Sequence, residues 1–361
     1  MLVLVSAPGW AQKQNLSYRP VDAEYSNALD RIVIAAGGPN ALYLYDPVNN
    51  ISDTISLTAA PMALSISPDG LSAAVLHSAS VSLVNLSAKS ITKSFVLPSS
   101  VSSGQSIVLA KDWIYLTPGV SINIASGAQT GTTNYYTAPA RLSPDGNSIY
   151  LAGLQKLDVS KGALSTSNYL NNSTNGLWFS KDGIKLYTAG GAYNVSSDTK
   201  ASAAFADLAY YSVFAEVMQM RGVAESSSKG TAVLDDTTSN YYNSPNIGTP
   251  IRLYDTNLTQ AGTLTLPTVS VGAKSYQNYG RWVFFNNAGT ALFVVMQADS
   301  ASGLLSDFAI QTYNLTNPPP CVATFASSAV TGLAGGGEMA RWRSRQQRTV
   351  FFRQRQAMPH G

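Results

Sequence analysis

The chain has little charge, one cysteine and two histidines. Charged side chains make up 12% of its 361 residues, about half of the usual share for a soluble globular protein. A single cysteine, Cys321, excludes an internal disulfide. His77 and His360 are too few for an ordinary zinc site, and the Cys-x-x-Cys-His motif of haem attachment is missing. We therefore predict no metal and no cofactor.

Long apolar runs are also missing, since no apolar stretch approaches the roughly 20 residues that a membrane-spanning helix needs. The net charge of +3 is concentrated at one end, because the last 21 positions hold six arginines and no acid. Removing these six from the 23 basic residues leaves 17 basic against 20 acidic side chains. The body of the protein is thus mildly acidic, which argues against a nucleic-acid partner. The six are Arg341, Arg343, Arg345, Arg348, Arg353 and Arg355.

A short turn motif recurs along the chain, at Ser67-Pro68-Asp69-Gly70, Ser143-Pro144-Asp145-Gly146 and Ser180-Lys181-Asp182-Gly183. Proline presets φ, aspartate bonds the local backbone, and glycine takes the left-handed position that closes a hairpin. The motifs are 76 and 37 residues apart, about two repeats and then one of a period near 40. Such a period predicts a β-propeller.

Alignment on this turn gives seven units of four strands, each with an apolar second strand and a third strand that ends in Asp or Asn, as in Leu42 to Asp46. The terminal Asp or Asn is suited to begin the next tight turn. The last unit lacks a fourth strand before Pro318, and residues 15–19 could supply it. We predict an all-β fold, a seven-bladed β-propeller closed by an N-terminal strand, over residues 15–317. The seven turns are at 27–30, 68–70, 111–112, 144–146, 181–183, 228–230 and 286–289.

The Ser-Pro-Asp-Gly turn, the apolar strand after it and the strand ending in Asp resemble the YVTN-type seven-bladed propellers of secreted bacterial proteins, which are relatives of the WD-repeat class. The resemblance covers about residues 15–316 and implies a fold rather than a chemistry. Beyond it, Pro318 to Cys321 and Gly335 to Gly337 resemble the start of a BACON-type Ig-like module. Such modules are associated with adhesion to glycans or mucins.

Both ends of the chain differ in composition from the repeats. Residues 1–14 combine an apolar run with small residues at Gly9 and Ala11, which favours the remnant of a signal peptide, although an ordinary apolar strand is the alternative. We therefore expect an extracellular or periplasmic protein. Residues 318–361 are interpreted as a truncated Ig-like start with a basic tail, the alternative being a genuine tail that binds an acidic surface.

The predicted loops between second and third strands are longest in the last three units, near residues 190–199, 235–250 and 297–307. All three would emerge on one face, where aromatic rings with carboxylate or amide acceptors suit a sugar or a peptide. We predict a non-catalytic binding or scaffold protein, monomeric, with a glycan or protein ligand at this ridge. Its residues would be Tyr193, Asp235, Asp236, Tyr241, Tyr242, Asn243, Asp299 and Asp307.

Three alternatives stay open. A hydrolase or lactonase acting in the central channel would need clustered titratable groups around His77, and the sequence shows neither such a cluster nor a Gly-x-Ser-x-Gly motif. A calcium site through Asp299 and Asp307 would rest on few carboxylates. A ridge without any ligand is the remaining interpretation of the long loops.

Overall fold

The computed structural model describes residues 11–98, 106–117, 119–131, 139–151, 155–159, 165–169, 177–188, 191–195, 199–202, 220–226, 230–235, 251–271, 273–276, 278–298 and 308–316. The chain divides into two compact units. One is Gln12–Tyr313, and the other holds both chain ends, of which Ala11 and residues 314–316 are described. The proposed signal remnant before Ala11, the Ig-like start and the arginine-rich tail lie outside the described residues.

The described residues form seven four-stranded antiparallel sheets and one two-stranded sheet, without a helix. No described segment could therefore cross a membrane as a helix. The first four sheets are β2 (Pro20–Ser26), β3 (Arg31–Gly37), β4 (Asn40–Asp46) and β5 (Ile51–Ser56); β6 (Ala63–Ile66), β7 (Ser72–Leu76), β8 (Ser80–Asn85) and β9 (Ser90–Val96); β10 (Ile107–Leu109), β11 (Trp113–Leu116), β12 (Val120–Asn123) and β13 (Gln129–Gly131); and β14 (Ala140–Leu142), β15 (Ser148–Leu151), β16 (Gln155–Asp158) and β17 (Ser165–Tyr169).

The remaining strands follow the same order, with one addition. The hairpin of β26 (Val269–Val271) and β27 (Lys274–Tyr276) lies between the sixth and seventh sheets in the chain. The sheets are β18 (Leu177–Phe179), β19 (Lys185–Thr188), β20 (Gly191–Asn194) and β21 (Thr199–Ser202); β22 (Met220–Ser226), β23 (Gly230–Asp235), β24 (Ile251–Tyr254) and β25 (Gln260–Leu264); and β28 (Asn278–Phe285), β29 (Ala291–Ala298), β30 (Phe308–Asn314) and β1 (Ala11–Asn15).

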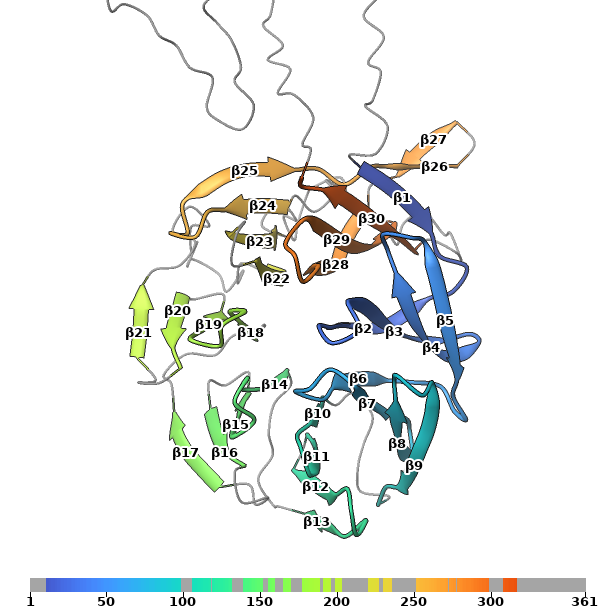
Figure 1. The fold of residues 1–361 in the computed structure, drawn as a ribbon, viewed down its shortest axis with the longest axis vertical. Helices are drawn as coiled ribbons and strands as arrows, with labels where there is room; N and C mark the ends of the chain where they lie inside the picture. Colours follow the sequence, from blue (N-terminus) through green and yellow to red (C-terminus); the bar gives the residue numbers. More distant parts are fainter. Residues whose placement is uncertain are drawn as a thin grey trace, which may run out of the picture. The chain divides into compact units, whose positions relative to one another are not determined.

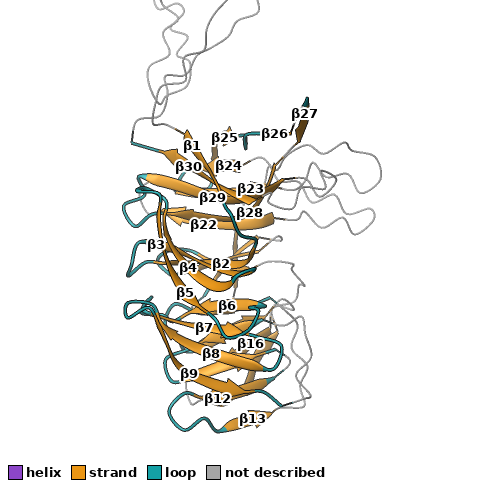
Figure 2. Cartoon of the chain, turned by 90° about the vertical axis from the view of Figure 1, so that its right-hand side faces the viewer, coloured by secondary structure: helices purple, strands orange, loops and turns teal. Residues whose placement is uncertain are grey.

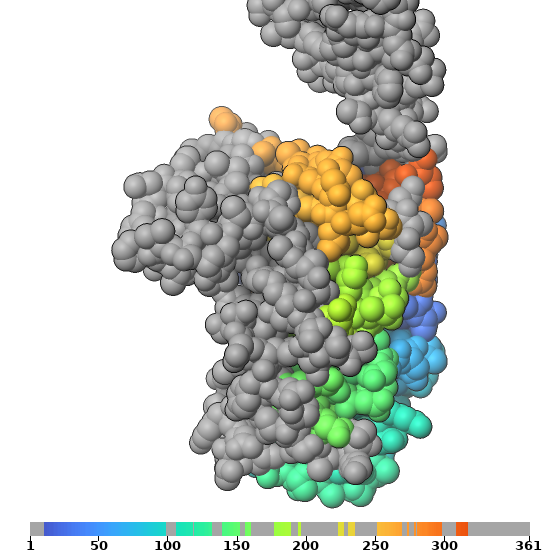
Figure 3. All heavy atoms as spheres, turned by 90° about the vertical axis from the view of Figure 1, so that its left-hand side faces the viewer, coloured from blue at the N-terminus to red at the C-terminus, as the bar shows by residue number. Residues whose placement is uncertain are grey.

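The first strand of each sheet contacts the first strand of the next, in the order β2, β6, β10, β14, β18, β22, β28 and back to β2. The sheets of this unit are thus arranged in a ring with these inner strands at its centre (Figure 1). Figure 3, in which the colours follow the sequence, shows the side of the molecule. The colours of residues near 130, 190 and 260 follow one another there, so successive sheets are arranged in chain order. The predicted β-propeller is confirmed.

An N-terminal strand completes the last sheet, as predicted, but it comprises Ala11–Asn15 and not residues 15–19. β1 pairs with β30 in the order β1-β30-β29-β28, and the amide of Leu16 continues the pairing by donating to the Phe308 carbonyl (2.9 Å). The strand begins at Ala11, so residues 11–14 belong to this sheet and not to the segment before the propeller. All five side chains of β1 are exposed. The pattern of apolar residues therefore could not place its start.

Apolar side chains fill the spaces between neighbouring sheets, because alternate residues of each strand face opposite sides. Val33 and Ala35 of β3 pack toward Val75 of the next sheet. Ile32 and Ile34 face the other way, into a cluster shared with the last sheet. Both faces of such a strand are buried, which explains why the second strands appear as continuous apolar runs.

The Ser-x-Asp-Gly turns have one geometry in all three copies. In the second copy, the buried Ser143 hydroxyl donates to the Asp145 carboxylate (2.5 Å) and accepts from the Ser148 amide (2.9 Å). Gly146 has φ of +75°, the left-handed value that the motif predicts. The first and third copies repeat these bonds through Ser67 and Ser180.

Replacing Ser143 by alanine should lower the free energy of unfolding by about 1–2 kcal/mol, because the Ser148 amide and the Asp145 carboxylate both lose a buried partner. Urea unfolding followed by tryptophan fluorescence measures the loss. Ser90→Ala, at an exposed position, is the control and should change stability by less than about 0.5 kcal/mol. Equal effects of the two substitutions would contradict a structural role for the turn serine.

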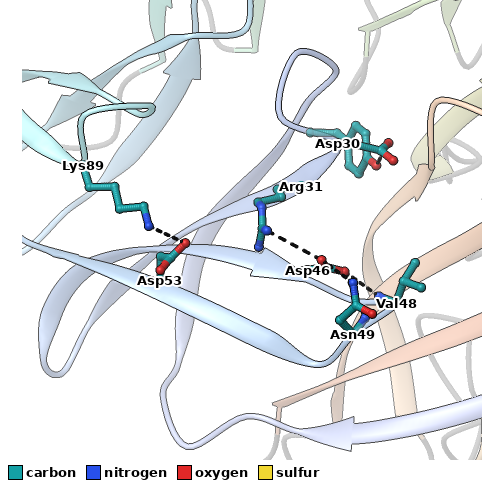
Figure 4. A network of polar contacts seen from close by, with 8 residues as sticks. Asp30, Arg31, Asp46, Val48, Asn49, Asp53 and Lys89 are labelled. Atoms are coloured by element: carbon teal, nitrogen blue, oxygen red, sulfur yellow. Dashed lines mark hydrogen bonds and ion pairs between the residues drawn. The ribbon is translucent and has the colours of Figure 1, made fainter.

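The Asp or Asn at the end of a third strand begins the next turn, as the sequence predicted. Asp46 accepts the amides of Val48 and Asn49, both at 3.0 Å (Figure 4). The equivalent side chains of four other sheets accept local amides in the same way, and they are Asn85, Asn123, Asp255 and Asn314. The short turns gather mainly at the left-hand edge of the sheets in Figure 2.

Candidate functional site

Four charged residues lie on three of the inner strands that surround the centre of the ring, and we call them the central cluster. Asp22 and Glu24 lie on β2, Arg141 lies on β14, and Arg281 lies on β28. β28 is next to β2, whereas β14 belongs to a sheet three places away on the far side of the ring (Figure 1). The charge of Arg141 nevertheless acts on both carboxyls, and that of Arg281 acts on Asp22. The two arginines thus belong to inner strands at different places around the ring.

The alternation of β2 explains why its two acids share one side. Ala23 and Tyr25 face the last sheet, where Ala23 is buried and Tyr25 packs on Phe284 and Phe293. Asp22 and Glu24 face the opposite way, toward β6, the inner strand of the next sheet. Asp22 accepts the Leu64 amide (2.9 Å) and Glu24 accepts the Ile66 amide (2.7 Å).

These two bonds belong to a wider pattern at the inner edge of the ring. An inner strand has a free edge, and its amides need acceptors. Ser65 accepts the Leu109 amide (3.0 Å), and Ser106 accepts the Ala140 amide (3.2 Å). Polar side chains of one sheet thus satisfy the amides of the next. The sequence signal for these hydrogen bonds is a polar residue that alternates with apolar residues in the first strand of a repeat. The sequence analysis did not recognise it.

Burial changes the titration of both carboxyls. Burial raises the pKa of Asp22, while the Leu64 amide and Arg141 act in the opposite direction. Burial likewise raises the pKa of Glu24 from an ordinary value near 4.5 to about 7. The Arg141 charge opposes this shift, and the Asp22 charge adds to it. Both side chains keep part of their surface exposed, so Glu24 can exchange protons with solvent near neutral pH.

The face that carries the turns between first and second strands, which we call the turn face, is closely packed. Ser26 donates from one turn to the Gly70 carbonyl of the next (2.6 Å). Asn287 connects three turns, since its amide donates to Asp30 (2.9 Å) and its carbonyl accepts Lys181 Nζ (3.0 Å). Nearby, Lys89 of the second sheet bonds to Asp53 of the first (2.8 Å; Figure 4). We call the opposite side, where the second strands end, the loop face.

His77 is not part of the central cluster. It is 1% exposed, with Nδ1 3.1 Å from the Ala60 carbonyl and Nε2 2.9 Å from the Ser82 hydroxyl. Both ring nitrogens are therefore engaged in structural hydrogen bonds. Among the described residues, no three His, Cys, Asp or Glu side chains are grouped as a metal site.

The structure corrects one part of the predicted ridge. The segment 190–199 was expected to be a loop between second and third strands, but Gly191–Asn194 is the third strand β20. Tyr193 pairs there with Leu186 and Lys200. The sequence GAYN contains no β-branched residue, so its strand propensity was too low to be recognised.

Of the other seven predicted ridge residues, the structure describes only Asp235. Asp235 is the last residue of β23 and pairs with Met220 at the end where β23 reaches the loop face. Six residues lie outside the described part of the chain, and they are Asp236, Tyr241, Tyr242, Asn243, Asp299 and Asp307. The described structure thus brings none of the eight into contact with another.

Comparison with known proteins identifies the fold and no family. The structure is similar to the β-propeller domain of Cps50 (Swd1) from Myceliophteria thermophila, with a TM-score of 0.57 and 9% sequence identity. The match covers 84% of this chain and 99% of that domain. No protein-family model and no curated protein sequence matches the chain. At this identity the likeness concerns the fold alone, and one fold can host many unrelated functions.

Proposed function

We propose that this protein is a non-catalytic, secreted binding propeller of the YVTN type, which holds a glycan or a protein on its loop face. The observation that carries the proposal is the difference between the two faces. On the turn face, hydrogen bonds join turns of different sheets to one another. At the loop face β23 and β29 end and β24 and β30 begin, and residues 236–250 and 299–307 connect these strands in the chain. Long connections on a rigid scaffold commonly bind ligands.

The contacts of both His77 ring nitrogens support binding rather than catalysis. A buried histidine whose two nitrogens are hydrogen-bonded within the protein is not placed to act on a substrate. One observation favours hydrolysis as a second candidate. The pKa of Glu24, raised by burial to about 7, suits a general acid or base at neutral pH. Release of product from lactone or glycoside substrates by the purified chain would support this second candidate.

A glycan array probed with the labelled full chain tests the first proposal. We expect binding to a limited set of glycans, confirmed by isothermal titration calorimetry. The variant carrying Tyr241→Ala and Tyr242→Ala should bind at least tenfold more weakly, because stacking of a sugar on an aromatic ring is lost. The matched control carries Ile51→Thr and Val96→Thr, at exposed positions of outer strands. Turnover of a substrate without saturable glycan or protein binding would overturn the proposal.

A further inference from the structure

Eight Asn-x-Ser/Thr motifs occur in the chain, and each is a candidate acceptor of an N-linked glycan in a secreted protein. Transfer of a glycan needs an asparagine side chain that is exposed and free to enter the active site of the transferring enzyme. The motif by itself does not separate the eight, so the structure has to. The asparagines are Asn15, Asn50, Asn85, Asn171, Asn172, Asn194, Asn257 and Asn314.

Three of these side chains already have a structural role. Asn50 uses both ends of its amide, since Oδ1 accepts the Tyr45 hydroxyl (2.8 Å) and Nδ2 donates to a glutamine of β1 (3.1 Å). Asn85 Oδ1 accepts a backbone amide of the next turn (2.7 Å). Asn314 Oδ1 accepts the hydroxyl of its own motif, from Thr316 (2.5 Å). Each of the three would have to give up hydrogen bonds before it could react.

Asn15 is exposed, but its motif is anchored in the fold. It is the last residue of β1, and the next residue, Leu16, is 5% exposed and donates its amide to the Phe308 carbonyl (2.9 Å). An enzyme that binds the three residues of this motif would have to draw Leu16 out of the core. The motifs that begin at Asn171, Asn172 and Asn194 extend beyond the described residues.

Asn257 is both exposed and free. With Leu258 and Thr259 it lies in the turn between β24 and β25, the two outer strands of the sixth sheet (Figure 1). Asn257 and Thr259 are exposed, and neither side chain is hydrogen-bonded to another described residue. The backbone hydrogen bonds of residues 257–259 in the described structure all involve Asp255. The motif can therefore open without breaking a strand pairing.

The backbone of this turn also favours opening. Leu258 has φ of +61°, a left-handed value that L-amino acids other than asparagine and aspartate rarely adopt. In the motif of Asn50 the left-handed residue is the asparagine itself, with φ of +54°, which tolerates this conformation. Opening the turn at Leu258 relieves strain, whereas opening the turn at Asn50 does not.

We propose that Asn257 is the acceptor of an N-linked glycan, which an oligosaccharyltransferase transfers from a lipid diphosphate. Asn257 Nδ2 forms a bond to C1 of the first sugar as the bond from C1 to the diphosphate oxygen breaks. The lipid diphosphate leaves with the electron pair, and the amide proton passes to a base of the transferase. The inference goes beyond the proposed function and rests only on its secretion. The third strands end on the turn face, so a glycan at Asn257 leaves the loop face open.

Transfer in vitro to the purified, unglycosylated full chain tests the proposal. The reagents are an oligosaccharyltransferase and a lipid diphosphate-linked oligosaccharide, and mass spectrometry of tryptic peptides locates the product. Trypsin cleaves after Arg252 and Lys274 and so releases residues 253–274, in which Asn257 begins the single motif. We expect transfer to Asn257 to be at least about tenfold faster than to Asn50, which must first give up two hydrogen bonds. Synthetic peptides of the two motifs correct for their intrinsic rates.

Substitutions separate the motif from the fold. Thr259→Val removes the hydroxyl of the motif and should abolish transfer to Asn257, whereas Thr259→Ser keeps the hydroxyl and should preserve transfer. The matched variant for the other turn combines Gln14→Ala with Tyr45→Phe. It removes both hydrogen bonds of the Asn50 side chain and should increase transfer to Asn50. Thermal unfolding of each variant confirms that it is folded.

The outcomes are distinct from those of the glycan array. No transfer to Asn257, or equal corrected rates at Asn257 and Asn50 in the folded chain, overturns the proposal. Transfer that survives Thr259→Val also overturns it, because the motif would then not be what the enzyme recognises. The reaction does not require the chain to bind a ligand, so failure of the array contradicts the proposed function alone.

Discussion

Replacement of Gly230 by alanine should lower the free energy of unfolding by about 2–5 kcal/mol, the largest effect we expect from a single methyl group in this protein. Gly230 begins β23 with φ of +87°, which costs other residues about 1–2 kcal/mol. A Cβ atom there would lie 2.0 Å from the Tyr254 carbonyl oxygen. Because that oxygen belongs to the backbone of the paired strand β24, relief requires the two strands to separate, which adds about 1–3 kcal/mol.

The control for this experiment is Gly146→Ala. Gly146 has a similar φ of +75°, but an added Cβ meets nothing within 4 Å. Its substitution should therefore cost only the conformational penalty of about 1–2 kcal/mol. Urea unfolding measures both variants, and hydrogen exchange of the β23 amides provides a second measure if Gly230→Ala is poorly soluble. Equal losses in the two variants would show that the strand contact does not matter.

The variant Glu24→Gln should be more stable than the unaltered protein above pH 7, by up to about 3 kcal/mol. Burial raises the pKa of Glu24 to about 7. A carboxyl with a raised folded-state pKa binds its proton more tightly in the folded protein, so stability falls as pH increases from about 4.5 to 7 and then levels off. Each pKa unit corresponds to about 1.4 kcal/mol. Glutamine keeps an acceptor for the Ile66 amide and cannot ionise, so this loss should disappear.

Urea unfolding at pH 5, 6, 7 and 8 measures the effect. Asp53→Asn is the control, because the hydrogen bond from Lys89 lowers the pKa of Asp53 and places its titration below this range. The control should keep the pH dependence of the unaltered protein between pH 5 and 8. If Glu24→Gln has the same slope as Asp53→Asn, then Glu24 is ionised throughout and the raised pKa is wrong.

Local chemistry made the strands and turns predictable. The serine of each Ser-x-Asp-Gly turn bonds within five residues, and its glycine needs a left-handed φ wherever the turn lies. The third strands end in Asp or Asn for an equally local reason, as the bonds of Asp46 show. Closure by an N-terminal strand could be predicted by counting the strands of each unit, because the last unit lacked its fourth strand. The start of the closing strand at Ala11 could not be predicted from the pattern of apolar residues, because all of its side chains are exposed.

The centre of the ring was not predictable from the chain, because its members are far apart in the sequence. Asp22 and Arg141 act on each other only after the sheets close into a ring, and no short-range pattern connects them. The raised pKa of Glu24 likewise arises from burial among inner strands of other repeats. Tyr193 was misplaced because pairing with Leu186, and not its own propensity, makes its segment a strand.

The sequence by itself thus determined the repeat, the hairpin turns and the all-β class, since each depends on residues within one period of about 40. Tertiary structure alone decided which polar side chains meet at the centre and which face is closed by turn contacts. Both depend on ring closure, in which an inner-strand residue gains its partners from neighbouring and opposite sheets. The Leu64 amide, held by the Asp22 carboxylate at 2.9 Å across 42 residues of chain, is the clearest instance.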